Sequence, residues 1–246
     1  MKSGKEHSVH FFLRSVRPTN AYEETMQRLL QSIRLGISPP GSRLPSERDL
    51  AEMLKVSRDT VRDALGTLVE QGYVISRRGR YGGTFVCEVL PNRGLEQETV
   101  HALSEEEIDD LAVLRRVIEV GAAQLAASRE LKASERAELV EELRASSEAS
   151  ATDYRRLDAR LHLLIAELTG SGTLLRIAAD LRTRVNAAFD EIPLLTPNLT
   201  NSNIQHKQIV DAILSGNSDL AAKEMLKHVE GSDALLQGYL ASTTKD

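Results

Sequence analysis

The stretch that decides the fold is GSRLPSERDLAEMLKVSRDTVRDALGTLVEQGYVISRRGRYGGTFV, residues 41–86. Ser46 is placed to cap a short helix, and Ser57 is placed to cap a second helix that ends at Gly72. Residues 55–57 leave room only for a short connection between the two helices. The pattern therefore predicts two short helices joined by a tight turn.

The second predicted helix has an apolar face and a polar face. Its apolar residues recur at three-to-four spacing and are Val61, Ala64, Leu65, Leu68 and Val69. Its polar residues, in the first turn and a half, are Arg58, Asp59, Thr60 and Arg62. A recognition helix presents this end to the major groove, where arginine contacts guanine edges or phosphates. Double-stranded DNA is therefore the first partner to consider.

Two β-prone segments follow this helix. Residues 73–75 and 84–86 are rich in β-branched and aromatic side chains, and the basic, glycine-rich run 77–83 lies between them. A hairpin with arginines at its tip suits phosphates or the minor groove. With a further helix expected over about Tyr22–Leu35, the segment predicts a winged helix-turn-helix of three helices and a hairpin wing.

Net charge alone does not identify the partner. Residues 21–90 contain ten Lys or Arg and nine Asp or Glu. The positive charge is instead local, at one helix end and in the wing, where DNA phosphates would lie. A helix-turn-helix can also serve as an interaction module in which Arg58 and Arg62 are merely solvated, and this is the alternative interpretation.

The whole chain of 246 residues is long enough for two domains. No apolar run approaches the ~20 residues that cross a bilayer, and the N-terminus lacks a signal-peptide core, so we expect a cytoplasmic protein with no membrane partner. Cys87 is the only cysteine, which excludes an intrachain disulfide. The expected parts are a flexible arm (1–20), a winged helix-turn-helix DNA-binding domain (21–90), a linker (91–103), a helical domain (104–240) and a tail (241–246).

The second domain carries the opposite charge. Residues 91–246 contain 17 Lys or Arg and 26 Asp or Glu, which makes a poor surface for DNA. The composition is rich in Ala, Leu, Glu and Arg, and no alternating strand pattern of useful length is present. We expect an all-α bundle of six main helices over about 104–127, 134–152, 153–169, 174–191, 201–214 and 219–240.

Four polar residues fall on the inward faces of these helices. Asp158 and His162 are four residues apart on one stripe, His206 heads another, and His228 lies on the inner side of the last helix. Three imidazoles and one carboxylate suit a divalent metal, Zn²⁺ first, with Ni²⁺ or Mn²⁺ as alternatives. Because unpaired polar groups are costly in a bundle core, we interpret the four together as a metal site rather than as hydrogen-bonded core residues.

The N-terminal motifs resemble the GntR family of bacterial transcription regulators. The similar stretches are LPSER (44–48), VSRDTVRDAL (56–65) and GGTFV (82–86). The resemblance implies that the residues contacting operator DNA are Arg48, Ser57, Arg58, Thr60, Arg62, Arg78 and Gly79. Asp59 departs from the hydroxyl residue often found at its position in the family, which leaves the base preference there open.

The helical domain resembles the FCD effector domain of the FadR-type subfamily over about residues 108–238. Its motif Asp-x-x-x-His and its two later histidines are similar to the four candidate ligands, and residues 114–119 are similar to its first motif. The resemblance implies a homodimeric regulator, often a repressor, on a palindromic operator. A small carboxylate metabolite would bind beside the metal and change operator affinity.

The side chains that could contact such an effector are Arg115, Arg184, Asn186 and Asn203, with Arg182 as a further candidate. The alternatives are a salt bridge on the bundle surface for Arg115 and a solvated helix face for residues of the fourth helix. Two other functions stay open, a sensor of the metal itself and a protein whose metal is purely structural. A metal-dependent enzyme competes as a class, but no HExxH, phosphate-binding glycine loop or nucleophile motif is present, so we predict no enzyme.

Overall fold

The computed structural model describes residues 21–79, 82–91, 104–190, 192, 194 and 196–243. Among these residues it contains nine helices and one two-stranded antiparallel sheet, so the prediction of a mainly helical chain is confirmed. The chain divides into two compact units. One ends at Leu30 and resumes over Gly41–Glu88, and the other contains Gln31–Pro40 and the chain from Val89 onward.

Several sequence predictions fall outside the described residues. These are the arm (1–20), the linker beyond Pro91, Arg80 in the wing and the end of the tail (244–246). The chosen boundaries between the predicted parts therefore stay predictions. Within the part of the chain that is described, no helix is both long enough and apolar enough to cross a membrane.

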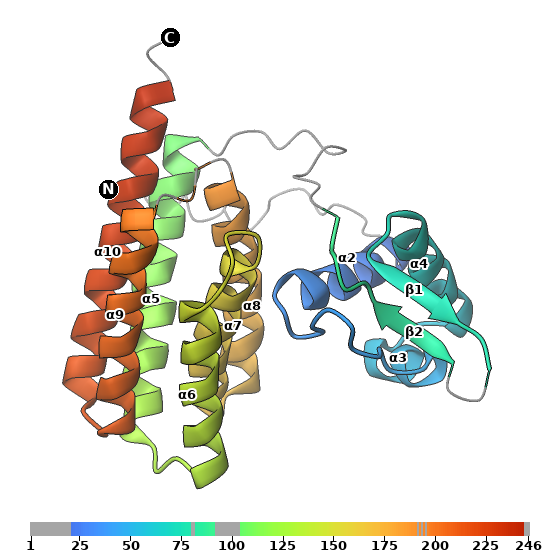
Figure 1. Ribbon diagram of the computed structural model, residues 1–246, viewed down its shortest axis with the longest axis horizontal. Coiled ribbons are helices and arrows are strands. Elements are labelled where there is room, and N and C mark those ends of the chain that lie inside the picture. The colour runs from blue at the N-terminus through green and yellow to red at the C-terminus, as the bar shows by residue number, and fades with distance from the viewer. Residues whose placement is uncertain are drawn as a thin grey trace, which may run out of the picture. The chain divides into compact units, whose positions relative to one another are not determined.

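The first unit is a winged helix-turn-helix, as predicted (Figure 1). Its helices are α2 (Ala21–Arg34), whose last turn from Gln31 belongs to the second unit, α3 (Glu47–Leu54) and α4 (Arg58–Glu70). Ser46 Oγ accepts a hydrogen bond from the backbone N–H of Asp49 at 3.3 Å, and Ser57 Oγ accepts one from Thr60 at 3.0 Å. Each serine therefore caps the helix expected of it. Between the helices, Lys55 takes a left-handed conformation with φ 56°, which closes the tight turn.

The wing is the hairpin of β1 (Val74–Arg77) and β2 (Gly83–Val86), whose register runs from Val74 opposite Val86 to Arg77 opposite Gly83. The segment before α3 lies along β2, because the backbone N–H of Leu44 donates to the Thr84 carbonyl oxygen at 2.9 Å. This contact joins the wing to the start of the helix-turn-helix.

The core of the first unit lies under α4. Val61, Ala64 and Leu68 are completely buried, and Leu65 is nearly so. The prediction that Val69 shares this face is wrong, because its side chain is 40 % exposed. Because successive residues of an α-helix are rotated by about 100°, Val69 lies beyond Leu65, outside the arc that the four buried residues define. Tyr22 ties α2 to this layer through a hydrogen bond of 2.7 Å between its hydroxyl and that of Thr67.

The second unit is a bundle of six helices, which confirms the predicted all-α architecture (Figure 1). The helices are α5 (Glu105–Ser128), α6 (Ala133–Ser147), α7 (Tyr154–Glu167), α8 (Gly172–Asp190), α9 (Thr196–Leu214) and α10 (Ser218–Thr243). Helix α5 packs against α7, α8, α9 and α10, which places it at the centre of the bundle. Its buried small residues, Ala122, Ala123, Ala126 and Ala127, suit close approach of the neighbouring helices.

Two helix limits differ from the prediction. Helix α9 begins at Thr196, whereas the sequence predicts a helix that begins only at about Asn201. Proline in a first helical turn removes no intrahelical hydrogen bond, so Pro197 is compatible with the longer helix. Helix α6 ends at Ser147 rather than at Thr152, and the segment after it forms a turn in which Ser150 Oγ accepts from the backbone N–H of Asp153.

The burial of α4 predicts unequal effects for two valines on the same helix. Val61→Ala is expected to lower the free energy of unfolding by about 2 kcal/mol, because it leaves a cavity in the core. Val69→Ala, the matched control, is expected to change it by less than about 0.5 kcal/mol. Urea unfolding of the full chain, followed by circular dichroism, measures both values. Equal losses would contradict the assignment of the buried face.

Candidate metal centre, adjoining cavity and DNA-binding surface

The structure brings the four predicted metal ligands together. Asp158 and His162 come from α7, His206 from α9 and His228 from α10, and their possible ligand atoms all lie within 4.8 Å of one another. The three histidine side chains are buried. The ligand atoms of a tetrahedral zinc ion lie about 3.4 Å apart, so the residue types fit one divalent cation, and small side-chain movements would bring these atoms to that spacing.

The hydrogen bonding of the histidines also fits a metal. Neither ring nitrogen of His162 or of His206 has a hydrogen-bond partner, although all four are buried. In His228, Nδ1 pairs with Gln205 Oε1 at 3.1 Å, which leaves Nε2 as the atom that can bind a cation. Buried polar atoms normally have partners, so one nitrogen of each of these rings is free to bind a missing cation.

Burial keeps the three imidazoles neutral, which is the form that binds metals. It depresses the pKa of His162 and of His228 well below the ordinary value of 6.5. The pKa of His206 is also lowered by burial, although the carboxylate of Asp158 opposes the effect. His206 Nε2 lies 3.3 Å from Asp158 Oδ1.

Behind this cluster, five charged residues, of which only Asp158 is partly exposed, form an alternating chain across four helices. Asp233 of α10 pairs with Arg115 of α5 at 2.5 Å, and Arg115 pairs with Glu119 at 3.2 Å. Glu119 in turn pairs with Arg182 of α8 at 3.0 Å, and Arg182 pairs with Asp158. The Asp158 end of this charge chain is therefore part of the candidate metal centre.

The arginines keep two of these carboxyl groups ionised. Burial alone would raise the pKa of Glu119, but Arg115 and Arg182 bring it below its ordinary value. Burial would likewise raise the pKa of Asp158, but Arg182 and the neighbouring histidines bring it below the ordinary value. A carboxylate at Asp158 is the form that binds a cation.

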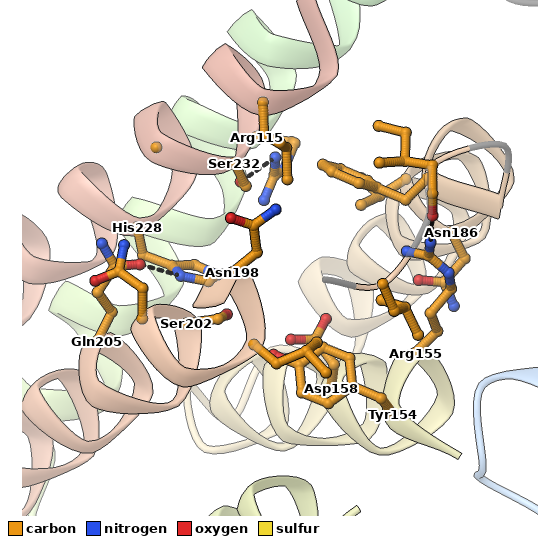
Figure 2. A pocket seen from close by; sticks show the side chains of 18 of the residues that line it. Arg115, Tyr154, Arg155, Asp158, Asn186, Asn198, Ser202, Gln205, His228 and Ser232 are labelled. Carbon is orange, nitrogen blue, oxygen red and sulfur yellow. Dashed lines mark hydrogen bonds between the residues drawn. The ribbon is translucent and has the colours of Figure 1, made fainter. Parts of the chain in front are cut away.

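A cavity of about 150 Å³ adjoins the candidate metal centre (Figure 2). Asp158 and His228 belong both to the metal cluster and to the cavity lining. In Figure 2, Arg115 and Ser232 lie at one side of the cavity, while Tyr154 and Asp158 of α7 lie at another. A molecule in this cavity would therefore contact the metal cluster directly.

The structure separates the predicted effector contacts into two groups. Arg115, Arg182 and Asn186 line the cavity, and both arginines are buried rather than on the bundle surface. Arg184 is exposed and pairs with Asp110 at 3.3 Å, and Asn203 donates to the Ser147 carbonyl oxygen at 3.3 Å. Neither of these two lines the cavity, so their selection as effector contacts finds no support in the geometry.

Sequence reasoning missed several polar residues of this region, namely Glu119, Asn198, Ser202, Gln205, Ser232 and Asp233. Glu119 gave a usable signal, since it is a charged residue on the buried face of a helix and one turn after Arg115. Gln205 gave none, because its partner His228 is 23 residues away on another helix.

In the first unit, the predicted DNA contacts lie on exposed parts of α3, α4 and the wing, and Thr60 is partly exposed. Arg62 pairs with Glu47 at 3.1 Å and with Asp59 at 2.9 Å. Ser57 and Thr60 share a hydrogen bond of 2.7 Å between their hydroxyls at the start of α4. The other predicted contacts are Arg48, Arg58, Arg78 and Gly79, and Gly79 has φ 106°, a conformation that favours glycine.

Two family models match the chain. Residues 21–86 match "Bacterial regulatory proteins, gntR family", and residues 110–231 match the FCD domain. A protein of Escherichia coli named "Putative L-lactate dehydrogenase operon regulatory protein" is 32% identical over 225 residues, which cover 87% of this chain and 85% of that protein. The HTH-type transcriptional regulator LutR of Bacillus subtilis is 28% identical over 84% of this chain and 97% of its own.

A solved structure supports the fold. McbR/YncC of Escherichia coli matches with a TM-score of 0.54 and 20% sequence identity, over 90% of this chain and 99% of that one. At this identity the match establishes the architecture alone.

The buried histidines predict that the metal-free chain loses stability in mild acid. In the unfolded chain their pKa values return to about 6.5, whereas burial depresses all three in the folded state. Below about pH 6.5 the unfolded state therefore binds protons that the folded state does not. The free energy of unfolding then falls with pH, by up to about 1.4 kcal/mol per pH unit for each histidine. Burial raises the pKa of Asp233, which acts in the opposite sense but is one group against three.

Urea unfolding in the presence of a chelator, between about pH 7 and pH 5, measures this slope. His206→Leu removes one of the three titrating groups and is expected to make the slope shallower by about a third. A free energy of unfolding that is constant over this range would contradict the burial of neutral imidazoles.

Proposed function

The chain belongs to the GntR family of bacterial transcription regulators and carries an FCD domain, and we propose that a divalent metal and a small carboxylate metabolite control its binding to operator DNA. The observation that carries this proposal is the shared lining, because Asp158 and His228 belong to both the metal cluster and the cavity. The matched relatives are named as regulators, so the prediction that the chain is no enzyme is confirmed.

The proposed metal ligands are Asp158, His162, His206 and His228, with Zn²⁺ as the first candidate and Ni²⁺ or Mn²⁺ as alternatives. When bound, the cation supplies an electrophilic centre that an acid's oxygen can contact. Gln205 holds the ring of His228 so that Nε2 faces the cluster, and Glu119 Oε1 lies 3.4 Å from Nδ1 of His162. Gln205 therefore orients a ligand without binding the cation itself, and Glu119 places a carboxylate beside a second ligand.

The proposed DNA contacts are Arg48, Ser57, Arg58, Thr60, Arg62, Arg78 and Gly79. Arg58 is exposed in the first turn of α4, the end that enters the major groove in this class of domain. To contact DNA, Arg62 must give up its salt bridges with Glu47 and Asp59. The contribution of Arg62 to DNA affinity therefore depends on salt concentration.

We propose a homodimer on a palindromic operator, acting as a repressor. Two recognition helices must be spaced to fit two half-sites, so a small change in their spacing has a large effect on operator affinity. Binding of an acid next to Asp158 would shift α7 relative to α9 and α10 and thereby change this spacing. The printed name of the Escherichia coli relative refers to lactate metabolism, and it supports a small carboxylate as the class of metabolite here.

Two other roles for the metal give different results. A metal sensor would change operator affinity with the cation alone and would not respond to any acid. A structural metal would leave operator affinity unaffected by acids, and its removal would unfold the helical unit. The proposed function requires a metal-loaded protein whose operator affinity changes when an acid is added.

The DNA assignment predicts that Arg58→Ala and Arg62→Ala each abolish sequence-specific binding, with a loss of at least about tenfold in affinity. The measurement is fluorescence anisotropy at fixed salt, with a duplex that the wild type selects from a random library. Arg28→Ala is the matched control, because Arg28 is an exposed arginine of the same unit that pairs with Glu24 at 3.1 Å. Unchanged affinity in both variants would overturn the assignment.

The metal assignment predicts that His206→Ala and His228→Ala weaken zinc binding by more than about tenfold. Operator binding in the absence of the acid should persist in both. Elemental analysis after dialysis and competition with a chromophoric chelator measure the metal. Lys207→Ala, which changes an exposed residue beside His206, is the control. Full metal content in both histidine variants would show that the four-ligand site is wrong.

A further inference from the structure

The cavity next to the candidate metal centre has a mixed lining. Its polar part includes Arg115, Asp158, Ser202, His228 and Ser232. Its apolar part consists of Val185, Phe189, Ile192, Leu194, Leu199 and Leu235. A volume of about 150 Å³ is comparable to cavities that hold one benzene molecule. The space therefore suits one small molecule with a polar end and a short apolar part.

The buried charge chain next to this cavity is not neutral. It contains two guanidiniums, Arg115 and Arg182, and three carboxylates, Glu119, Asp158 and Asp233. One negative charge is therefore in excess, and Asp158, at one end of the chain, lies among the three histidines, which are uncharged when they bind a cation. A divalent cation at these ligands converts the excess into one positive charge.

The third positively charged residue of the cavity lining, Arg155, already has an acidic partner. Arg155 pairs with Asp190 at 3.3 Å, and it donates a hydrogen bond of 2.8 Å to the Ile192 carbonyl oxygen. It therefore offers no free positive charge to a second acidic group. A buried region with one uncompensated positive charge is most stable with one anion beside it.

From these observations we infer that the effector is a monocarboxylate with a short apolar chain, and that it binds only the metal-loaded protein. The inference rests on the proposed function and names the class of metabolite. The carboxylate neutralises the single excess charge at the metal end, and the carbon chain lies among the aliphatic and aromatic side chains. Without the cation the region is negative and repels the same acid.

The same count of buried charges disfavours a dicarboxylate as the effector. The other polar groups of the lining, such as Asn198 and Ser202, are neutral, so its second carboxylate would enter the cavity with no unpaired cation to balance its charge. The cost appears as a difference in affinity between acids of equal length. We expect a monocarboxylate to bind at least about tenfold more tightly than the matching dicarboxylate.

Isothermal titration calorimetry of the zinc-loaded full chain tests this difference. The acids are a series from acetate to heptanoate, the matching diacids from malonate to pimelate, and the hydroxylated pair 2-hydroxybutanoate and malate. The same acids are added to the operator complex to measure changes in DNA affinity. The expected result is that monoacids bind at least about tenfold more tightly than the matching diacids, and that no acid gives heat when the metal is removed by a chelator.

A variant that removes one charge of the buried charge chain tests the charge count directly. Asp233→Asn removes one carboxylate of the chain without touching a proposed metal ligand, so the loaded region gains a second positive charge. The preference for monoacids is expected to shift toward diacids by about tenfold. Asp233→Glu retains the charge and should retain the preference. Asp211→Asn, at an exposed aspartate paired with Lys207, is the neutral control.

The possible failures are distinguishable. If diacids bind the zinc-loaded wild type as tightly as the matching monoacids, the inference is overturned while the proposed function stands. If monoacids bind equally well without metal, the inference is also overturned, because the excess positive charge is then not what attracts them. If no acid of either series binds or changes operator affinity, both the inference and the proposed function fail. The wild-type comparisons decide these outcomes even if Asp233→Asn does not fold.

Discussion

The organisation of the helical unit depends on the carboxylate of Glu119. It is buried in the central helix and pairs with Arg115 on its own helix and with Arg182 on α8. Each arginine has one further carboxylate partner, Asp233 for Arg115 and Asp158 for Arg182, so without Glu119 the buried charges would form two separate ion pairs. Through these two arginines, Glu119 links Asp233 of α10 to Asp158 of α7. One side chain thereby fixes four helices around the cavity.

This arrangement also explains why His162 and His206 can be buried without hydrogen-bond partners. The arginine pair of Asp158 keeps a carboxylate beside the imidazoles, and burial keeps the imidazoles uncharged. The cluster thus combines anionic and neutral ligands in one place, which is the composition that a divalent cation requires. An apolar core of the same volume would be no less stable, so stability alone does not account for these residues. The free-energy cost of burying these side chains is explained if they bind a ligand.

The fold was predictable where the signals are local. Ser46 and Ser57 cap helices through contacts three residues away, and the apolar face of α4 follows from its own spacing. The helical period also placed the four proposed ligands on inward faces, and the structure brings them together. Local signals gave a wrong prediction for Val69, which lies at the edge of the apolar pattern and is exposed. They also misplaced the start of α9, because Pro197 lies in the first turn of this helix although proline often marks a loop.

What the sequence could not provide is the pairing between helices. Arg115 and Arg184 are both arginines on predicted helices, and composition gives no reason to prefer one. The structure separates them, because Arg115 meets a carboxylate of α10 that is 118 residues away, while Arg184 meets an exposed aspartate. Only such long-range contacts determine the net charge of a buried region. The charge of the cavity, and with it the class of acid that fits, therefore follows from tertiary structure and not from any motif.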